Sequence, residues 1–337
     1  MTTLRIEPSD GEPLPLAGPG QYLTLVLNVP GTKRPAIRCY SLSHAPESSA
    51  YEVTIKATQR PDGAPGLVST HVQTLEVGDF VDAFAPRGSF TLDPAHPQGP
   101  LVFLAGGIGI TPFMSMLEAL AAGGAPDAAR EVHLYYGVRS GDEHAFASRL
   151  QSLASNAPWL HTTTCYSRPR DSDQLGADFQ RAGRVDLALI QETLPQSDRP
   201  YTFLICGPPA FLDSLTEGLR QLGVPEGQVK VEAFGAPSVR PLTRRLRRID
   251  PTNLPTVRFA RSEREAKWDP SATSLLDFAM DNGVFFPFAC AAGHCGTCAS
   301  ALLEGEVDYV TAPQFTLREG QCLPCVAVPR TDVTLDV

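Results

Sequence analysis

Five of the eight cysteines gather near the C-terminal end of the chain, and their spacing indicates a metal site rather than disulfides. Cys290, Cys295 and Cys298 form a C-x4-C-x2-C pattern, and Cys325 follows 27 positions after Cys298. Four thiolates with this spacing are the ligands of plant-type [2Fe–2S] clusters, in which one loop wraps the cluster and a distant strand supplies the last ligand. The sequence therefore predicts an iron–sulfur cluster held by these four cysteines.

The sequence also leaves two alternatives to this ligand set open. Four cysteines can hold zinc, although zinc sites more often use two paired C-x2-C motifs. Cys322 lies three residues before Cys325 and competes with it as the fourth ligand. Cys325 precedes the apolar run 326–328 and resembles the plant-type pattern, in which the last ligand opens a strand. Cys322 is therefore expected to be a buried or peripheral thiol.

A glycine-rich loop follows the apolar stretch 100–104 and stands where a strand is expected to turn into a helix; its residues are Gly107, Gly109, Ile110, Thr111 and Pro112. Glycines let the backbone approach a pyrophosphate, Thr111 is expected to cap the helix, and Pro112 suits its first position. Because Pro112 stands where the third glycine of G-x-G-x-x-G would be, the dinucleotide fingerprint is incomplete. A plain strand-to-helix turn explains the loop equally well.

Two patterns in the N-terminal part have the residue types that hold a flavin nucleotide. At the end of an expected strand, Arg38 can pair with a phosphate, Tyr40 can stack along a flavin, and Ser41 can donate to a ring nitrogen. Further along, Gly66 and Ser69 open an expected helix, whose N–H groups would form a second phosphate site. Taken singly, each of these residues is more often structural.

Another pattern ends the apolar stretch 201–206, where a parallel sheet presents its ligand-binding edge. Cys206, Gly207 and Pro208 stand there, and Glu232 and Phe234 follow further along the chain. A soft thiol and an aromatic ring near a flavin could position a nicotinamide. Taken alone, the pair is more simply explained as a buried cysteine and a core phenylalanine.

The first segment of the chain, residues 1–97, must position the flavin-type residues. Its short alternating runs are separated by Pro, Gly and Asn and predict an antiparallel β-barrel or sandwich with one helix at 66–75. The expected strands cover residues 22–29, 37–42 and 51–57.

The second segment, residues 98–236, alternates apolar strands with helices and predicts a doubly wound parallel sheet. The expected strands cover 100–105, 132–137, 161–166 and 201–206, and the expected helices cover 145–153, 209–222 and a stretch that begins at 112. Residues 237–255 are rich in Pro and Arg and predict a linker to a third segment, 256–337.

Charge and composition exclude several classes of protein. The formal net charge is −9, which opposes binding to nucleic acid or to anionic membranes, and no apolar stretch has the length of a membrane span. The first residues lack the features of a signal peptide, so a reducing cytoplasm is expected. The third segment has 11 acidic and 6 basic side chains, a net charge of −5, and is suited to a basic partner surface.

In their order, the motifs R-x-Y-S, G-x-x-S, G-G-x-G-x-T-P, C-G-P and E-x-F-G resemble the ferredoxin–NADP reductase superfamily over residues 20–236. The C-terminal segment is similar to plant-type ferredoxins. The whole chain resembles the reductase components of Rieske oxygenases, of the phthalate dioxygenase reductase arrangement, and its stretch 66–71 resembles the reductase half of flavohaemoglobins. This implies an antiparallel β-barrel flavin domain, a doubly wound parallel-sheet nicotinamide domain and a β-grasp ferredoxin domain, over 1–97, 98–236 and 256–337.

The resemblance also bears on the cofactors. FMN-type relatives carry Pro-Arg-Asn-x-Phe after the barrel, whereas residues 86–90 read Pro-Arg-Gly-Ser-Phe, so FAD is expected ahead of FMN. Ser167 and Arg168 resemble the pair that grips the 2′-phosphate of NADP, but the usual additional Lys and Tyr are not evident, so NADH is favoured over NADPH. Related barrels begin with a strand well before the stretch that starts at Gly18, so the first strand is expected to be absent or an upstream module lost.

Site residues follow from the same resemblance. It assigns Ser41, Cys206 and Glu232 to catalysis. It assigns to cofactor binding Arg38, Tyr40, Ser41, Leu42, Ile55, Lys56, Gly66, Val68, Ser69, Thr70, Gly107, Gly109, Ile110, Thr111, Pro112, Ser167, Arg168, Cys206, Gly207, Pro208 and Phe234.

The implied function is electron transfer from NADH through flavin and the [2Fe–2S] cluster to a protein acceptor, an oxygenase or demethylase component of the Rieske type. The same chain could instead reduce a haem protein or a hybrid-cluster protein. A non-enzymatic iron–sulfur sensor is an alternative of another class, and loss of the flavin or nicotinamide motifs would favour it.

Overall fold

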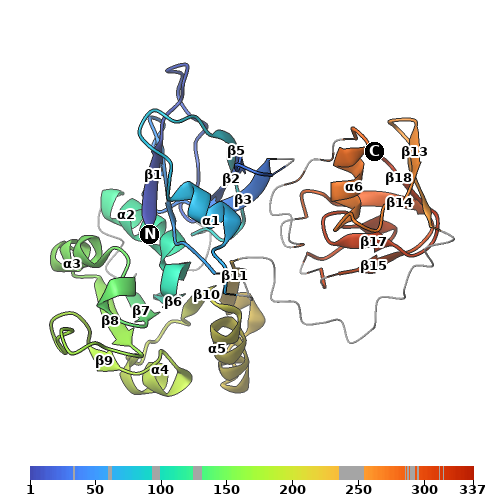
Figure 1. Ribbon diagram of the computed structural model, residues 1–337. Helices are drawn as coiled ribbons and strands as arrows, with labels where there is room; N and C mark the ends of the chain where they lie inside the picture. The colour runs from blue at the N-terminus through green and yellow to red at the C-terminus, as the bar shows by residue number, and fades with distance from the viewer. Residues whose placement is uncertain are drawn as a thin grey trace. The chain divides into compact units, whose positions relative to one another are not determined.

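The structure is a computed structural model that divides the chain into two compact units, Met1–Phe234 and Gly235–Val337 (Figure 1). It describes residues 1–32, 35–59, 63–92, 99–123, 131–234, 254–284, 286, 288, 293, 296–310, 312–313 and 315–337. Most of the stretch predicted as a linker, 237–255, lies outside these residues. Within the described part of the chain, no helix is both long and apolar enough to cross a membrane.

The described residues of the N-terminal part of the first unit form two antiparallel sheets and one short helix. One sheet has the order β3-β2-β5, the other pairs β1 with β4, and a bridge between Leu42 and Val53 links them. Leucines of β2 and the valines of the helix pack into one core, because β2 is apolar along most of its length. The elements are β1 (Thr2–Ile6), β2 (Tyr22–Leu27), β3 (Ala36–Ser41), β4 (Tyr51–Ile55), α1 (Leu67–Val72) and β5 (Asp82–Arg87).

Strand β1 corrects one expectation from the sequence. A strand does precede the stretch that starts at Gly18, and it pairs antiparallel with β4 from Thr2 opposite Ile55 to Ile6 opposite Tyr51. The expected absence of a first strand is therefore wrong. The strand is short, and alternate residues are exposed, so it lacks the buried apolar character of β2 and β4.

The rest of the first unit is a six-stranded parallel sheet with helices on both faces. The strand order is β11-β10-β6-β7-β8-β9. The central strands β6 and β10 are buried along their whole length, which explains why each is a continuous apolar run rather than an alternating one. The strands are β6 (Leu101–Gly106), β7 (Val132–Val138), β8 (Leu160–Tyr166), β9 (Arg181–Ala182), β10 (Thr202–Gly207) and β11 (Val229–Ala233).

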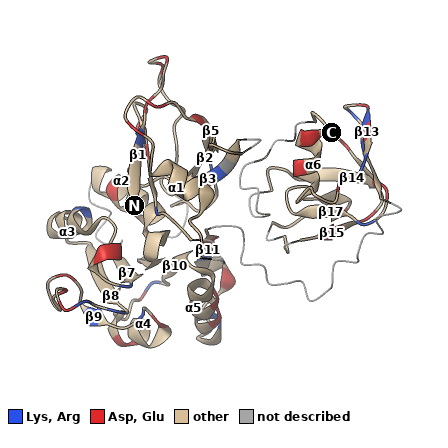
Figure 2. Ribbon diagram, in the orientation of Figure 1, with Lys and Arg blue, Asp and Glu red and all other residues tan. Residues whose placement is uncertain are grey.

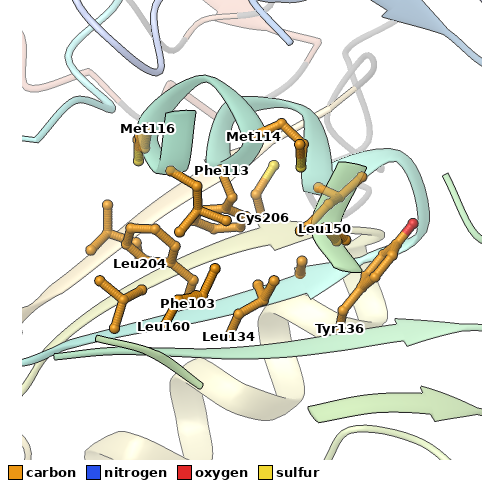
Figure 3. Packing of buried hydrophobic residues seen from close by; sticks show 14 of the residues in the cluster. Phe103, Phe113, Met114, Met116, Leu134, Tyr136, Leu150, Leu160, Leu204 and Cys206 are labelled. Atoms are coloured by element: carbon orange, nitrogen blue, oxygen red, sulfur yellow. The ribbon is translucent and has the colours of Figure 1, made fainter. Parts of the chain in front are cut away.

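Helices α2 and α3 cover one face of this sheet, and α4 and α5 cover the other. Phe103 of β6 packs with Phe113 of α2 and Leu150 of α3 in one core cluster (Figure 3), whereas Leu104 packs with Leu215 of α5 in another. Neighbouring strand residues thus serve opposite faces. The helices are α2 (Thr111–Ala122), α3 (Ala147–Asn156), α4 (Leu187–Thr193) and α5 (Pro209–Gln221), and the 3-10 turns are η1 (Gly107–Ile110), η2 (Gly141–Glu143) and η3 (Glu226–Gln228).

The predicted strands and helices of this segment all have counterparts within a few residues, but α4, β9 and β11 were not predicted. Each is short, and β11 keeps its side chains partly exposed at the edge of the sheet. Short edge elements lack the continuous apolar run of a central strand, so their identity depends on pairing with a neighbour.

In its described residues, the second unit has a mixed five-stranded sheet of order β13-β12-β18-β14-β16, the helix α6 and a two-stranded β15-β17 ribbon. This arrangement agrees with the expected β-grasp ferredoxin fold. Ser274 caps the helix by accepting a hydrogen bond from the Asp277 N–H, and the helix packs Phe278 against Trp268. The elements are β12 (Thr256–Phe259), β13 (Arg264–Lys267), α6 (Leu275–Asp281), β14 (Ser300–Glu304), β15 (Val307–Tyr309), β16 (Gln321–Cys322), β17 (Ala327–Pro329) and β18 (Val333–Leu335).

The core beneath α2 supports a stability prediction. Phe113 is fully buried, stacks on Phe103 with ring centroids 4.7 Å apart, and meets Phe90 edge-on at 5.8 Å. Phe113→Ala should lower the free energy of unfolding by about 3–5 kcal/mol, because it leaves a cavity that the sheet cannot close. Urea denaturation followed by circular dichroism measures the loss.

The matched control is Phe80→Ala, which truncates a phenylalanine that is 86% exposed. That variant should change the free energy of unfolding by less than about 0.5 kcal/mol. Equal losses in both variants would show that burial between α2 and the sheet is not what makes Phe113 matter.

Candidate functional site

The carboxyl edge of the parallel sheet brings together residues from three neighbouring strands. In the sheet register, Cys206 of β10 stands beside Ala105 of β6 on one side and beside Glu232 of β11 on the other. The carboxyl edge of a parallel sheet is where doubly wound folds bind their ligands. The predicted Cys206 and Glu232 are thus neighbours, although 26 positions separate them in the sequence.

Ser41 reaches the same place from the other sheet system. Its hydroxyl donates a hydrogen bond to Glu232 Oε2 at 3.2 Å, across 191 positions of the chain. Ser41 ends β3 and is buried, so the strand that carries the expected flavin residues meets the strand that carries the expected nicotinamide residues. The structure therefore places the three predicted catalytic residues around one point.

The ionisation of this group follows from its surroundings. Burial raises the pKa of the Glu232 carboxyl to about 8, and the hydrogen bond from Ser41 opposes only part of that rise. Burial, with a smaller contribution from the Glu232 charge, also raises the pKa of the Cys206 thiol well above its usual range. At neutral pH both groups carry their protons, so Cys206 is not a nucleophilic thiolate.

The glycine-rich loop lies next to Cys206 and has no room for side chains there. A Cβ on Gly109 would lie 2.3 Å from the Cys206 carbonyl oxygen, so only glycine fits. A Cβ on Gly107 would meet nothing within 4 Å, and Gly107 has a φ of +57°. The loop is therefore packed closely on the protein side and open on the other, as a cradle for a pyrophosphate requires.

The cap predicted for Thr111 is wrong. The loop residues Gly107–Ile110 form a 3-10 turn that runs directly into α2, so the Thr111 backbone is already part of the helical spiral. The Thr111 hydroxyl instead donates back to the Ile108 carbonyl oxygen at 3.0 Å. Pro112, expected at the first position of the helix, is its second residue and still lies within the first turn.

The loop after β10 is packed against the loop after β6. A Cβ on Gly207 would lie 2.9 Å from the Phe211 ring and 3.0 Å from the Gly106 Cα, and Pro208 directly precedes α5. Phe234 follows β11 and packs against the core beneath α2. Gly207, Pro208 and Phe234 therefore border the same edge as Cys206.

The predicted flavin residues lie on β3, at the end of β4 and at the start of α1. Arg38 and Tyr40 share one side of β3, opposite to Ser41, since side chains alternate along a strand. Leu42 is buried in the bridge to Val53. Lys56 follows β4, where Ile55 is buried, and its ammonium pairs with Glu143 Oε2 at 2.6 Å.

Residues at the start of α1 have structural partners of their own. The Ser69 hydroxyl accepts from the Thr58 N–H at 3.0 Å and donates to the Gly66 carbonyl oxygen at 3.2 Å. Val68 is buried in the core, and the Thr70 N–H donates to the Gly66 carbonyl oxygen. The Ser69 hydroxyl thus closes the loop before α1, and the phosphate contact at this helix start stays a prediction.

Ser167 and Arg168 follow β8 at the same carboxyl edge. Their backbone N–H groups donate to the carbonyl oxygens of Val138 and Arg139, which ties the loop after β8 to the loop after β7. The Arg168 side chain is exposed. Two positions later, Arg170 pairs with Asp142 and, at 2.6 Å, with Asp173.

Two of the four predicted cluster ligands lie among the described residues. Cys298 and Cys325 are both buried in the core of the second unit, whereas Cys290 and Cys295 lie outside the described part of the chain. Cys322 is fully buried, and burial, together with the charge of Cys298, raises the pKa of its thiol to about 12. Two soft sulfur donors in an apolar core suit an iron–sulfur cluster.

The glycines of the cluster loop have the predicted conformation. Gly293 and Gly296 adopt φ angles of +79° and +70°. A Cβ on Gly296 would lie 2.3 Å from the Phe315 ring, so that ring packs directly on the loop backbone. Loop geometry and sulfur donors both fit the predicted [2Fe–2S] site.

Sequence reasoning missed Glu143 and Arg149, which join the two halves of the first unit. Glu143 pairs with Lys56, and Arg149 of α3 pairs with Glu52 of β4 at 2.7 Å. Isolated charged residues on a turn and on a helix have no pattern that distinguishes them from solvated ones. Only the tertiary structure shows their partners.

A separate cavity of about 790 Å³ lies between α3, β8 and the segment 170–180. None of the predicted site residues lines it. Volume alone therefore does not locate the chemistry of this protein, whereas the converging polar side chains at the sheet edge do.

Family models match three successive parts of the chain. They are described as an oxidoreductase FAD-binding domain over residues 10–92, an oxidoreductase NAD-binding domain over residues 103–217, and a 2Fe-2S iron-sulfur cluster binding domain over residues 257–330. These matches confirm FAD, a nicotinamide nucleotide and a [2Fe–2S] cluster as the cofactors of the three domains.

Two relatives each match about 70% of the chain. A flavohemoprotein of Halalkalibacterium halodurans is 36% identical over 237 residues, which are 70% of this chain and 56% of that protein. The chain thus spans little more than half the length of that relative. The flavohemoglobin from Malassezia yamatoensis, solved with bound FAD and heme, is 26% identical with a TM-score of 0.58 and covers 69% of this chain and 56% of its own.

One solved structure matches all three domains. Phthalate dioxygenase reductase, described as a modular structure for electron transfer from pyridine nucleotides to [2Fe-2S], is 27% identical with a TM-score of 0.66. The match covers 99% of this chain and 92% of that one. Together with the three family models and the geometry of the sheet edge, it shows that the chain belongs to the ferredoxin reductase superfamily of oxidoreductases, as a member with FAD-binding and NAD-binding domains and a C-terminal [2Fe–2S] domain.

Proposed function

We propose that this protein takes electrons from NADH, passes them through FAD and a [2Fe–2S] cluster, and delivers them to a separate oxygenase or demethylase component of the Rieske type. The observation that carries the proposal is the hydrogen bond between Ser41 and Glu232. It joins β3, which has the expected flavin residues, to the carboxyl edge of the parallel sheet, the expected nicotinamide edge, within one compact unit. The match to phthalate dioxygenase reductase over all three domains supports the same order of cofactors.

The division of work between cofactors and protein follows from their chemistry. A bound flavin accepts two electrons from a nicotinamide and releases them singly, which a one-electron cluster requires. The chain's own residues orient the two rings and exclude water. In this proposal Arg38 and Tyr40 hold the flavin, Gly107 and Gly109 receive the pyrophosphate of the nucleotide, and Cys206 borders the nicotinamide.

Glu232 and Ser41 would supply a neutral polar pair at the point where the two rings meet. Because the raised pKa keeps a proton on Glu232 at neutral pH, no carboxylate charge opposes the arrival of electrons at the flavin. The Ser41 hydroxyl, directed at Glu232 Oε2, is held in one orientation beside the expected flavin position.

NADH is proposed ahead of NADPH because of the charges after β8. A 2′-phosphate requires unpaired cations, and Arg170 is already paired with Asp142 and Asp173. Arg139, whose carbonyl oxygen accepts from the Arg168 N–H, is likewise paired, with Glu143. Arg168 remains, and its exposed side chain has no ion pair among the described residues. The 2′-hydroxyl of NADH makes no such demand.

The acceptor is proposed from charge and from likeness. The segment 256–337 has a net charge of −5, and Figure 2 shows acidic residues on α6 of this unit. Opposite charge on a partner would steer association and make it faster at low salt. A haem protein is the second candidate acceptor, because the first unit resembles the FAD and NAD parts of flavohemoproteins.

An anaerobic titration of the purified protein with NADH tests the order of electron transfer. Flavin absorbance should bleach and cluster absorbance should then fall, and chromatography should identify the released flavin as FAD. A colourless preparation after cluster reconstitution, or a cluster that stays oxidised while the flavin bleaches, would contradict the proposal. Adding a Rieske-type oxygenase component and, separately, a haem protein to the reduced chain distinguishes the two acceptors.

Cys322 and Cys325, three positions apart, allow a matched test of the fourth cluster ligand. Cys325→Ala should lose bound iron and the NADH-dependent reduction of cytochrome c, while NADH-dependent reduction of ferricyanide persists because this dye accepts electrons from the flavin. Cys322→Ala removes an equally buried sulfur three residues away and should keep its iron. If iron were lost only in Cys322→Ala, Cys322 and not Cys325 would be the fourth ligand.

Glu232 predicts a pH dependence of stability. The folded protein holds the proton up to about pH 8, whereas the unfolded carboxyl releases it near pH 4.5, so rising pH favours unfolding throughout this window. From pH 5 to pH 8 the free energy of unfolding of the wild type should fall by about 3 kcal/mol more than that of Glu232→Gln. This figure takes about 1.4 kcal/mol for each pKa unit and a reduction for partial solvation of the carboxyl group. Urea denaturation at several pH values measures it, and parallel profiles for the two proteins would contradict the raised pKa.

A further inference from the structure

Arg149 of α3 makes an unusually complete set of contacts between the two halves of the first unit. Its Nη1 donates to Glu52 Oε1 at 2.7 Å, and its Nε donates to Glu118 Oε1 at 2.9 Å. Its Nη2 donates to the Ser43 carbonyl oxygen at 3.2 Å and also lies 2.5 Å from Glu118 Oε1. One guanidinium therefore contacts α2 of the nucleotide domain, strand β4 of the flavin domain and the segment that follows β3.

The groups that Arg149 contacts are themselves linked. The Ser43 hydroxyl donates to Glu52 Oε1 at 3.1 Å, so Glu52 accepts from both Ser43 and Arg149. His44 lies within 3.0 Å of Arg149 Nη2 through its Nδ1 and also contacts Glu118. The segment that follows β3 is thus held from its backbone and its side chains together.

This segment is the direct continuation of the strand that ends in Ser41. Ser43 lies two residues beyond Ser41, a distance of about 7 Å at about 3.3 Å for each residue of a strand. Ser41 donates to Glu232 at the sheet edge. A shift of Ser43 against α3 would therefore move Ser41 against Glu232.

Strand β4 is held in a complementary way. Glu52 near its start pairs with Arg149, and Lys56 just after its end pairs with Glu143. The two residues are four positions apart, or about 13 Å along a strand. The flavin domain supplies the carboxylate of one ion pair and the ammonium of the other. Because the two ion pairs are this far apart, they oppose rotation of the flavin domain about either one.

Arg149 is fixed on its own side as well. Phe146 has a φ of +59°, an uncommon conformation for phenylalanine, and its ring lies 5.1 Å below the Arg149 guanidinium. Leu150, the next residue along the helix, is buried in the core beneath α2 (Figure 3). The guanidinium is therefore preorganised by its helix rather than by flexible surface contacts.

We propose that Arg149 is a positioning residue for electron entry, which sets the flavin domain against the nicotinamide edge through Glu52, Glu118 and the Ser43 carbonyl group. This inference rests on the proposed NADH-to-flavin step. A planar fork with several donors is needed, because a lysine ammonium cannot reach two carboxylates and a carbonyl oxygen in these directions. The two rings must meet within a fraction of an ångström, so the effect of a loosened domain boundary falls on the rate at saturation.

The test is stopped-flow reduction of the bound flavin by NADH under anaerobic conditions, with rates expressed per bound FAD. Arg149→Met should slow the saturating rate about tenfold or more, while the NADH concentration at half-maximal rate changes little. Arg149→Lys should recover part of the rate. Arg220→Met, which removes an exposed arginine paired with Glu217 on α5, is the matched control and should match the wild-type rate.

The outcomes separate this inference from the proposed function. If NADH does not reduce the wild-type flavin, the proposed function itself fails. If the wild type is reduced and Arg149→Met loses thermal stability or flavin but reduces its remaining FAD at the wild-type rate, Arg149 is only structural and the inference is overturned. Should Arg149→Met not fold, Arg149→Lys and Glu52→Gln decide: a slower rate per bound FAD supports positioning, and wild-type rates in both overturn it.

Discussion

The site of the first unit depends on one contact, the hydrogen bond from Ser41 to Glu232. Its two residues come from different sheets, and neither would face the other unless both sheets had already folded and packed. The carboxyl group is shielded enough to keep its proton at neutral pH, so the contact does not depend on a charged partner. The ion pairs of Lys56 and Arg149 hold the same boundary at its edges, where solvent is closer and charge is less costly.

Close packing imposes the second constraint, at the loops after β6 and β10. Gly109 and Gly207 each stand where a single Cβ would overlap neighbouring backbone or side-chain atoms. The two loops therefore occupy one narrow space at the carboxyl edge of the parallel sheet. Gly107 differs from them, because its open surroundings leave space on the outer side of the same loop. A pyrophosphate would approach from that side.

In the second unit, burial and close packing surround the described cysteine sulfurs. Cys298 and Cys325 are buried in an apolar core, and the ring of Phe315 packs against the backbone of Gly296. Hydrophobic surroundings and limited solvent access are the conditions that set the potential of an iron–sulfur cluster. Meanwhile the acidic excess of this unit lies on its surface, where it can act on a partner without entering the core.

The amino-acid sequence by itself determined the order of the domains, the central strands and the glycine loops, and it named Ser41, Cys206 and Glu232, which the fold brings together. These features are local: apolar runs mark β6 and β10, and C-x4-C-x2-C needs only its own spacing. The sequence failed for β1 and β11, which are short and partly exposed, and for the Thr111 cap, because η1 absorbs the start of α2. Only the tertiary structure decided that Ser41 meets Glu232 and that Arg149 joins two domains, because such contacts link residues about a hundred or more positions apart. No local pattern encodes a partner at that distance; it is chosen when the two sheets pack and their remaining polar groups must find one another.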